Sequence, residues 1–210
     1  MNISPNSTPP QPAGQRGPVE HERREQIIAA ADEHFRQYGY GKTTVADLAK
    51  AIGVSSAYVY RFFDSKQSIG EAVCALTLER MLVALDAIVS SNHGAAERLR
   101  RIYKELVVQG VALYFNERRL HDIVVAAVGE RWRSVENYKI AIHEVVRRIV
   151  LAGRESGEFE RKTPLDETCR AIVETLTPFC HPILLEQTSR ESLDENAVAV
   201  SNLVLRSLAP

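Results

Sequence analysis

The sequence predicts an all-α protein of about nine helices, with a small three-helix unit at the N-terminus and a larger helical domain after it. Three observations support this prediction. From residue 20 onward, apolar residues recur at intervals of three and four, which is the period of an amphipathic helix. No stretch alternates apolar and polar residues over the length of a strand. Glycines and helix-capping residues separate the periodic stretches, as expected for helices joined by short turns.

The composition is that of an ordinary globular chain. Of 210 residues, 45% are hydrophobic and 25% are charged, with a formal net charge of −1, which allows a sizeable buried core. No apolar run is long enough to span a membrane, and the N-terminus lacks the basic and apolar regions of a secretory signal. We therefore expect a soluble, cytoplasmic protein without a membrane partner. The near-neutral charge neither supports nor excludes nucleic-acid binding, because phosphate attraction depends on a local basic face.

The first 18 residues are rich in proline, serine, asparagine and glutamine, and they carry a single charge, Arg16. Such a segment cannot bury enough apolar surface to offset its ordering entropy. We therefore predict a disordered arm over residues 1–18, with a DNA-tethering role as the alternative. The helix predicted next, over residues 20–38, ends at Gly39. Its apolar stripe consists of Ile27, Ile28, Ala31 and Phe35.

Two short helices complete the N-terminal unit, which we assign to residues 19–66. Thr44 precedes the first of them, and Gly53 ends it. The apolar positions of this helix fall at i, i+3, i+4 and i+7, namely Val45, Leu48, Ala49 and Ile52. Ser55 has the residue type and position of an N-cap for the second short helix.

The remaining chain, residues 67–210, is predicted to form the larger helical domain. A capping box of Asp64 and Gln67 begins a long helix that reaches about Ser91 and ends before Gly94. Further helices are predicted over residues 95–115, 119–128, 130–155, 164–187 and 192–208. Their ends are marked by Gly157, by Thr163 before Pro164, and by a second capping box of Ser192 and Glu195.

The stretch 44–66 has the pattern of a helix-turn-helix. A glycine in the turn, Gly53, tolerates the backbone conformation that folds one helix across the other. Val59, Phe62 and Phe63 are then expected in the core. The outer face of the second helix carries Ser56, Ala57, Tyr58, Tyr60 and Arg61. A short polar and aromatic face with little acid suits the major groove of DNA.

These residues resemble the TetR family of bacterial regulators. The family pattern is a threonine-rich entry, an apolar helix ending in Gly-Val-Ser, and a second helix bearing Leu-Tyr-x-Tyr/Phe-Phe with a lysine after it. The corresponding positions here are Thr43-Thr44, Val45 to Ile52, Gly53-Val54-Ser55, Val59-Tyr60-Arg61-Phe62-Phe63 and Lys66. The remaining chain is similar to the family only in the number and length of its helices.

The resemblance implies a role for each position that contacts DNA. Thr44, Tyr60 and Lys66 are expected at backbone phosphates, and Ser56, Ala57 and Tyr58 at base edges. The family more often has glycine or proline at position 57 and threonine at position 58, so the operator sequence cannot be inferred from relatives. Arg61 is expected either at a phosphate or as a solvated charge. The full set predicted to contact DNA is Thr43, Thr44, Ser55, Ser56, Ala57, Tyr58, Tyr60, Arg61 and Lys66.

A helical domain behind a DNA reader suggests a sensor for a small lipophilic or aromatic effector. The candidate ligand contacts are polar or aromatic residues within apolar helices, and ordinary core packing is the alternative for each. They are Tyr103, Gln109, Tyr114, His121, Trp132, Tyr138, His143 and His181. We expect no cofactor.

Metal binding and catalysis have no support in the sequence. The nearest candidates for metal ligands, His121, Asp122, His143 and Glu144, lack the spacing of a metal site. The three cysteines, Cys74, Cys169 and Cys180, also lack such spacing and are expected to be reduced and mostly buried. No hydrolase or nucleotide-binding motif is present, so we do not expect an enzyme.

Helices within residues 164–208 are predicted to form a homodimer interface. Pro178 and Pro182 should bend the first of these helices, and together the helices carry more apolar surface than one subunit hides. An internal core helix is the alternative. A two-fold dimer presents two recognition helices and fits a palindromic DNA operator.

The resulting expectation is a ligand-responsive repressor that an effector releases from DNA. An activator or a ligand-independent DNA-binding protein of the same fold remains the principal alternative. A helical enzyme and a pure protein-interaction bundle are the alternatives from other functional classes.

Overall fold

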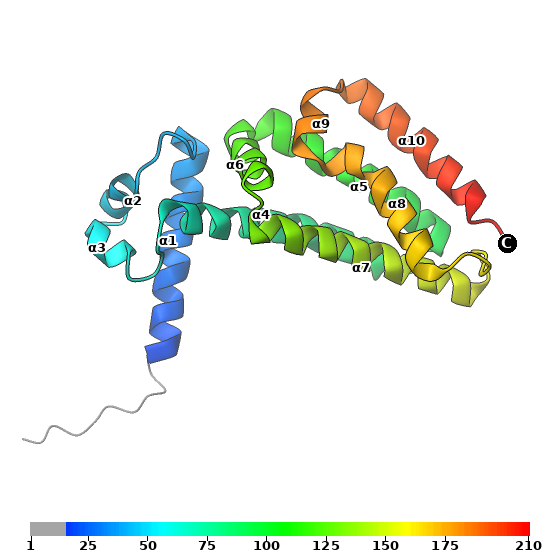
Figure 1. The fold of residues 1–210 in the computed structure, drawn as a ribbon, viewed down its shortest axis with the longest axis horizontal. Helices are drawn as coiled ribbons and strands as arrows, with labels where there is room; N and C mark the ends of the chain where they lie inside the picture. Colours follow the sequence, from blue (N-terminus) through cyan, green and yellow to red (C-terminus); the bar gives the residue numbers. More distant parts are fainter. Residues whose placement is uncertain (1–15) are drawn as a thin grey trace, which may run out of the picture.

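The computed structural model describes residues 16–210, which form ten α-helices and one π-helical turn with no strand among them. The predicted all-α class is therefore confirmed. A small N-terminal unit contains α1 (Arg16–Tyr38), α2 (Val45–Ala51) and α3 (Ser56–Val59). The long helix α4 (Lys66–Val89) leads from this unit into the larger domain (Figure 1). Of the arm predicted over residues 1–18, residues 1–15 lie outside the described part, and residues 16–18 belong to α1 instead.

The larger domain packs its helices around a continuous apolar core. It contains α5 (Ala95–Val111), the π-helical turn η1 (Ala112–Asn116), α6 (Arg118–Gly129), α7 (Arg133–Ser156), α8 (Leu165–Cys180), α9 (Pro182–Glu186) and α10 (Arg190–Ser207). Helix α7 lies along α4, and α5 packs against both α8 and α10 (Figure 1). This arrangement places the N-terminal unit at one end of α4 and the C-terminal helices at the far side of α5.

The predicted apolar stripe of α1 faces the core of the N-terminal unit. Ile27, Ile28, Ala31 and Phe35 are all buried. Gly39 follows α1 with a φ of 87°, as the sequence predicts for a helix end. The next aromatic residue, Tyr40, lies edge-on to Phe35, with ring centroids 5.3 Å apart. The first helix is thus held to the unit by a face that its periodicity alone identified.

Three predicted helix caps differ from those in the structure. Helix α4 is capped by Ser65 with Ser68, each hydroxyl accepting the other residue's backbone N–H at 3.1 Å, rather than by Asp64 and Gln67. Helix α10 is capped by Ser189, whose hydroxyl accepts the N–H of Ser192 at 3.2 Å. Helix α8 begins after Pro164 without a side-chain cap, so Thr163 does not cap it. In the first two cases a nearby serine caps the helix with the same geometry, but it accepts a different N–H group from the one that the predicted residue would accept.

The single helix predicted over residues 164–187 is divided into α8 and α9, which raises the number of helices above nine. Pro178 lies inside α8, so that proline does not end the helix. The break occurs at His181, whose ψ of 118° is extended. A residue that precedes proline is sterically biased away from the helical region, and Pro182 then occupies the first position of α9.

The end of the helix predicted over residues 95–115 also differs. The α-helical pattern stops at Val111 and continues as the π-helical turn η1. Glu117, with φ −125° and ψ 44°, then separates η1 from α6. Turns of this type are uncommon and frequently occur at functional sites. No helix in the described residues is both long enough and apolar enough to cross a membrane.

Candidate nucleic-acid interface

The turn between α2 and α3 depends on Gly53. This residue has a φ of 69°, a conformation that costs residues with a Cβ substantially more than glycine. Its N–H donates to the carbonyl of Lys50 at 3.2 Å, and the N–H of Val54 donates to the carbonyl of Ala49 at 2.9 Å. The chain therefore reverses within one residue, as a helix-turn-helix requires.

Small and branched apolar side chains fix α3 against α2. Leu48 and Ala49 of α2 are buried, as are Val59 and Phe63 on the other side of the turn. Ile52 and Val54 are partly buried and pack against the same cluster. The predicted core positions of the motif are therefore confirmed, except that Phe62 is only half-buried.

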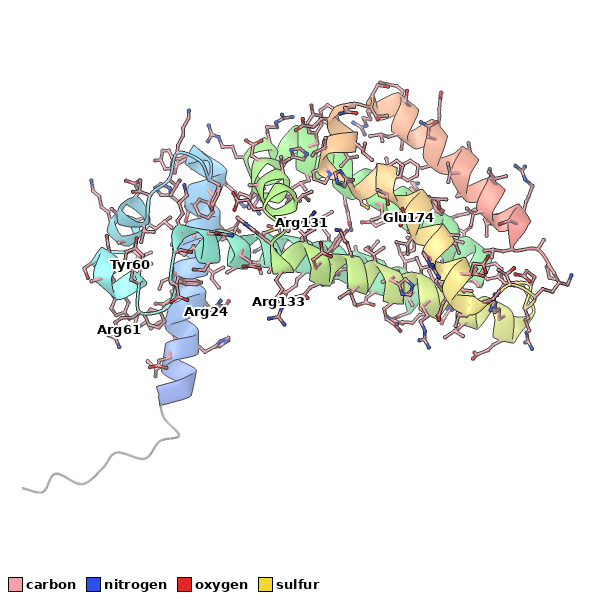
Figure 2. The ribbon with its side chains drawn as sticks, viewed as in Figure 1. Arg24, Tyr60, Arg61, Arg131, Arg133 and Glu174 are labelled. Carbon is pink, nitrogen blue, oxygen red and sulfur yellow. The ribbon has the colours of Figure 1, made fainter. Side chains whose placement is uncertain are left out.

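Helix α3 ends at Val59, so Tyr60 and Arg61, which were predicted on the outer face of the helix, follow it instead. The side of this segment that faces away from the core is open to solvent. Ser55 caps the helix by accepting the N–H of Tyr58 at 3.2 Å. Ser55, Ala57, Tyr60 and Arg61 are exposed, and the exposed fraction of Tyr60 reaches 52%. Figure 2 shows Tyr60 and Arg61 at the α3 end of the molecule, away from the C-terminal helices. The predicted separation of an outer polar face from an inner apolar face is thus present.

Tyr58 does not simply project outward. Its ring lies 5.3 Å from the ring of Phe62, and the guanidinium of Arg61 lies 5.6 Å from the centre of the Tyr58 ring. The side chain is half-buried and borders a small hollow whose other wall includes Arg23 and Gln26 of α1. Tyr58 therefore positions Arg61 as well as offering its own hydroxyl. Ser56, the other predicted base-reading position with a hydroxyl, is also half-buried.

Thr43 is not placed to contact DNA, which corrects its assignment to the interface. Only 1% of the residue is exposed. Its hydroxyl donates to the carbonyl of Gly39 at 2.8 Å and lies 3.2 Å from Nδ1 of His34. A buried, paired hydroxyl cannot reach a phosphate without disrupting the loop. Thr43 instead ties this loop to the end of α1.

Thr44 is exposed, but its polar groups are already engaged. The hydroxyl donates to Oδ2 of Asp47 at 2.6 Å and accepts the N–H of Asp47 at 3.2 Å. The N–H of Thr44 donates to the same carboxylate oxygen at 2.9 Å. These hydrogen bonds with Thr44 lower the pKa of the Asp47 carboxyl and complete a capping box. A phosphate at Thr44 would have to share this cap.

Lys66 is the first residue of α4, as predicted, and reaches back toward the loop before α2. Its Nζ lies 4.5 Å from the centre of the Tyr40 ring and 3.4 Å from the carbonyl oxygen of Gly41. Two exposed lysines on the same unit, Lys42 and Lys50, were missed from the sequence. Their charge and their position beside a helix-turn-helix were the available signal.

The eight residues proposed as ligand contacts do not line a common cavity. Trp132, Tyr138, Tyr103 and His121 are buried in the core, while the other four are half-buried. Gln109 borders a hollow of about 310 Å³, and Tyr103 borders a separate hollow of about 290 Å³ between α5 and α10. The structure therefore distributes these side chains over the domain.

Hydrogen bonds within the protein account for some of these side chains as parts of the core. Other side chains have a polar atom that no such hydrogen bond satisfies. The Tyr103 hydroxyl pairs with Thr175, and Nε2 of His121 donates to the carbonyl of Pro182 at 3.2 Å. Within the part of the chain that the structure describes, the hydroxyl of Tyr138 and Nδ1 of His181 are buried without a hydrogen-bond partner. Burial raises the pKa of Tyr138. Buried polar atoms without partners are uncommon and call for an explanation.

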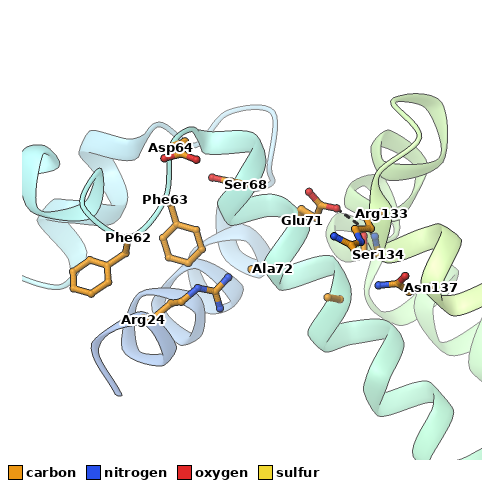
Figure 3. A pocket seen from close by; sticks show the side chains of 11 residues that line it. Arg24, Phe62, Phe63, Asp64, Ser68, Glu71, Ala72, Arg133, Ser134 and Asn137 are labelled. Carbon is orange, nitrogen blue, oxygen red and sulfur yellow. Dashed lines mark hydrogen bonds between the residues drawn. The ribbon is translucent and has the colours of Figure 1, made fainter. Parts of the chain in front are cut away.

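A further hollow, of about 390 Å³, lies between the N-terminal unit and α7 (Figure 3). Arg24 of α1 and Arg133 of α7 lie on opposite sides of it. Glu71 of α4 accepts the N–H of Ser134 at 3.3 Å across its wall. None of the eight candidate ligand contacts borders this hollow. Among residues 16–210, no three potential metal ligands come together.

Two family models match the chain. The model described as bacterial regulatory proteins of the tetR family covers residues 27–73. A second, described as a tetracyclin repressor-like C-terminal domain, covers residues 95–201. The first match contains the helix-turn-helix, and the second contains most of the larger domain.

Curated relatives include regulators and DNA-associated factors. The nucleoid occlusion factor SlmA of Vibrio cholerae is 30% identical over 71% of this chain and 76% of its own length. The SlmA of Vibrio campbellii is 29% identical, with 48% of this chain and 58% of that protein aligned. The HTH-type transcriptional repressor KstR2 of Rhodococcus jostii is 23% identical over 73% of this chain and 76% of its own length. The alignments thus span between 58% and 76% of these proteins' own lengths.

Solved structures share the fold. A TetR-family transcriptional regulator from Pectobacterium atrosepticum superposes with a TM-score of 0.75 at 20% identity, covering 93% of this chain and 98% of that one. The regulator FadR from Bacillus subtilis, in complex with stearoyl-CoA, gives a TM-score of 0.62 at 18% identity, covering 88% and 98%. The overall fold therefore recurs in solved regulators.

Proposed function

The chain belongs to the TetR family of bacterial transcriptional regulators, and we propose that it acts as a ligand-responsive repressor that binds a palindromic operator as a homodimer. The outer face of α3 is the observation on which this proposal rests. Ala57 of α3 is exposed there together with Tyr60 and Arg61, which directly follow the helix, whereas Val59 at its end is buried. In this proposal Tyr60, Lys66 and Thr44 bind phosphates, while Ser56, Ala57 and Tyr58 meet base edges.

Exposed apolar residues on the C-terminal helices support the homodimer. Val198 and Leu203 of α10 are each 62% exposed, and Ile183 of α9 is 41% exposed. Helix α8 packs one face on α5 and α7 and leaves Ala171 and Glu174 on its other face exposed. Pairing α8 and α10 with their two-fold copies would cover this surface. The two α3 helices would then meet half-sites about 34–36 Å apart.

The unpartnered polar atoms of the larger domain support an effector. A small lipophilic or aromatic molecule with one or two polar groups could satisfy the Tyr138 hydroxyl or Nδ1 of His181, which have no hydrogen-bond partner among the described residues. Two similar proteins are consistent with this role: KstR2 is a transcriptional repressor, and the structurally similar FadR was solved in complex with stearoyl-CoA.

The proposed mechanism is a change in the spacing of the two DNA-binding units. Effector binding would shift α4, which carries the N-terminal unit, and the two α3 helices would no longer fit successive major grooves. By linkage, the effector and DNA weaken each other's binding equally, with a coupling of about 1–3 kcal/mol. An activator or a ligand-independent regulator would have the same α3 face but would not show this release.

Selection of bound sequences from a random double-stranded DNA pool tests the proposal. The expected product is a palindrome bound by two subunits, as measured by light scattering of the complex. Fluorescence anisotropy of that DNA with a panel of acyl and aromatic compounds should then identify at least one that releases it. Selection of asymmetric sites by a monomer would contradict the dimeric reader, and a panel without any releasing compound would favour the ligand-independent alternative.

A further inference from the structure

Two hollows adjoin where α1 meets the corner between α5 and α6. One, of about 310 Å³, is bordered by α1, α4, α5 and η1, and the other, of about 300 Å³, by α1 and the start of α6. Arg36 and Glu117 border both hollows. Each volume is at the lower limit of small-molecule sites, which span about 300–1,000 Å³, and the two together lie within that range.

An ion pair forms the wall that the two hollows share. It joins the N-terminal unit to the larger domain. Nη1 of Arg36, on α1, lies 2.7 Å from Oε2 of Glu117, at the start of α6. Arg36 also pairs with Asp32 at 3.0 Å, and Asp32 pairs with Arg80 of α4 at 3.2 Å. Arg119 donates to the backbone carbonyl of Arg36 at 3.3 Å. The orientation of α1 is therefore tied to the α5–α6 corner through Arg36.

The two hollows differ in chemistry. The first has an apolar side made by Met81, Ala112 and Leu113. The second is bordered by Arg118 and Arg119 together with the shared pair. Within the described residues that border either hollow, Glu117 is the one carboxylate, against four arginines. Arg36 and Arg80 also pair with Asp32, and Arg118 pairs with Asp122 and Glu186, so among the described residues Arg119 alone of the four has no ion pair. A ligand with an apolar part and an anionic end would match both.

The protein around the first hollow also leaves a polar atom unsatisfied. The amide nitrogen of Gln109 donates to the carbonyl of Met81 at 3.0 Å and to Glu105 at 2.9 Å. Its Oε1 is buried and has no hydrogen-bond partner among residues 16–210. The π-helical turn η1, which supplies Ala112 and Leu113, begins three residues later. An irregular turn at one hollow is consistent with a binding site. The Gln109 acceptor does not itself favour an alkyl chain or an anion, because neither can donate a hydrogen bond to it.

We propose that this junction binds an amphiphilic anion, an alkyl or acyl chain that ends in a carboxylate or phosphate. The chain lies against Met81 and Leu113, and the anionic end binds Arg36 and Arg119 in place of Glu117. Displacement of Glu117 breaks the ion pair that ties α1 to α6, so the ligand acts on the orientation of the DNA-binding unit. This inference rests on the proposed ligand response and gives it a site and a route to α1.

Calorimetric titration of the DNA-free protein with decanoate tests the site, with decanol as the uncharged control. We expect saturable binding of decanoate and at least about tenfold weaker binding of decanol, because the charge-assisted hydrogen bonds are lost. Arg119→Ala should weaken decanoate binding by about tenfold. Glu117→Gln should strengthen it, because the competing carboxylate is removed. Arg101→Ala, an exposed arginine paired with Glu97 on α5 at 2.9 Å, is the matched control and should have no effect.

Equal binding of decanol and decanoate, or decanoate binding that is unchanged in both Arg119→Ala and Glu117→Gln, would overturn the proposal. So would an absence of decanoate binding. Because the titration contains no DNA, these results test ligand binding at the junction independently of DNA binding. If another compound releases the protein from the operator while decanoate does not bind, the proposed junction site is wrong, but the proposal of a ligand-responsive regulator is retained. If decanoate binds as expected but the protein binds no DNA in the selection experiment, the proposed function is wrong, but the proposed junction site is retained.

Discussion

Trp132 packs edge-on against Tyr40, with ring centroids 5.7 Å apart and an interplanar angle of 77°. Trp132 immediately precedes α7, and Tyr40 follows α1, so the contact joins the larger domain to the DNA-binding unit. Trp132 is the single tryptophan of the chain and is only 2% exposed. Its indole N–H donates to Glu130 at 2.8 Å. Its fluorescence therefore reports on the boundary between the two domains.

Replacing Tyr40 by alanine should loosen this boundary. The ring also contacts Phe35 and lies beneath the ammonium of Lys66, so truncation removes several contacts at once. Because Tyr40 is half-buried, we expect a loss of about 2–3 kcal/mol in the free energy of unfolding, below the cost for a fully buried ring. Urea denaturation measures this loss, and Trp132 emission should shift to longer wavelength in the folded state.

Tyr38→Ala is the matched control for Tyr40→Ala, because Tyr38 is a tyrosine of α1 that is 49% exposed. Its replacement should change stability by no more than about 0.5 kcal/mol. Equal destabilisation by the two variants, without a shift in Trp132 emission for Tyr40→Ala, would show that the aromatic contact does not hold the domains together.

Thr43→Val should destabilise the protein without removing a DNA contact. The change keeps the shape but deletes the hydroxyl that donates to the carbonyl of Gly39. We expect a loss of about 1–2 kcal/mol in the free energy of unfolding. The affinity of the folded fraction for DNA, measured well below the unfolding transition, should stay within about twofold of the parent. A large loss of affinity at full folding would restore Thr43 to the interface.

Glu158 should stabilise the protein in a pH-dependent way. Its two carboxylate oxygens accept the N–H groups of Ala95 and Ala96 at 3.0 and 3.1 Å, and these hydrogen bonds lower the pKa of Glu158. Gly94, the N-cap of α5, has no side chain to do this. A lowered folded-state pKa means that the stabilisation is complete above the unfolded-state pKa of about 4.3 and is lost as the pH falls through the folded-state pKa.

Glu158→Gln is the variant that isolates this effect. At neutral pH it should lower the free energy of unfolding by about 1 kcal/mol, as expected for loss of a helix cap. The difference from the parent should shrink as the pH falls below 4, where the parent carboxylate becomes protonated. Chemical denaturation at several pH values measures it. A difference that is independent of pH would argue against the ionised cap.

Leu203→Glu should separate the subunits of the proposed dimer. Leu203 is 62% exposed on α10, so the isolated subunit should tolerate the substitution, whereas two carboxylates in a paired apolar surface should not be tolerated. Size-exclusion chromatography with light scattering should show a monomer that binds the operator weakly. Val83→Glu is the control, since Val83 is 70% exposed on α4. If both variants remain dimeric, the interface lies elsewhere.

Much of the architecture follows from local sequence signals. The spacing of Ile27, Phe35, Val59 and Phe63 identified the buried faces of the N-terminal unit because a short helix must bury its apolar stripe. Gly53 identified the turn, because few other residues adopt its backbone conformation at low cost. Helix starts were less predictable. Several serines near Ser65 and Ser189 can each cap a helix, and small differences in local geometry select among them.

The site residues likewise divide into those that the local sequence predicts and those whose role depends on tertiary packing. Thr43 and Thr44 are adjacent and chemically identical, and only the packing of the loop against α1 determines that Thr43 faces inward. The aromatic residues of the larger domain, such as Tyr103 and Trp132, could not be assigned from sequence, because a ring that packs in a core and a ring that lines a cavity occupy similar helical positions. The pairing of Arg36 with Glu117 joins residues far apart in the chain and leaves no sequence signal.

The most direct test of a DNA-reading α3 compares two kinds of variant on two DNA sequences. Anisotropy titrations at fixed salt use the selected operator and a scrambled duplex of the same length and composition. Tyr60→Ala should weaken binding to both by about the same factor, roughly fivefold or more, because a phosphate contact carries no sequence information. Ser56→Ala should weaken binding to the operator alone and thereby reduce the preference between the two. Unchanged affinity in both variants would contradict the assignment of α3 as the recognition helix.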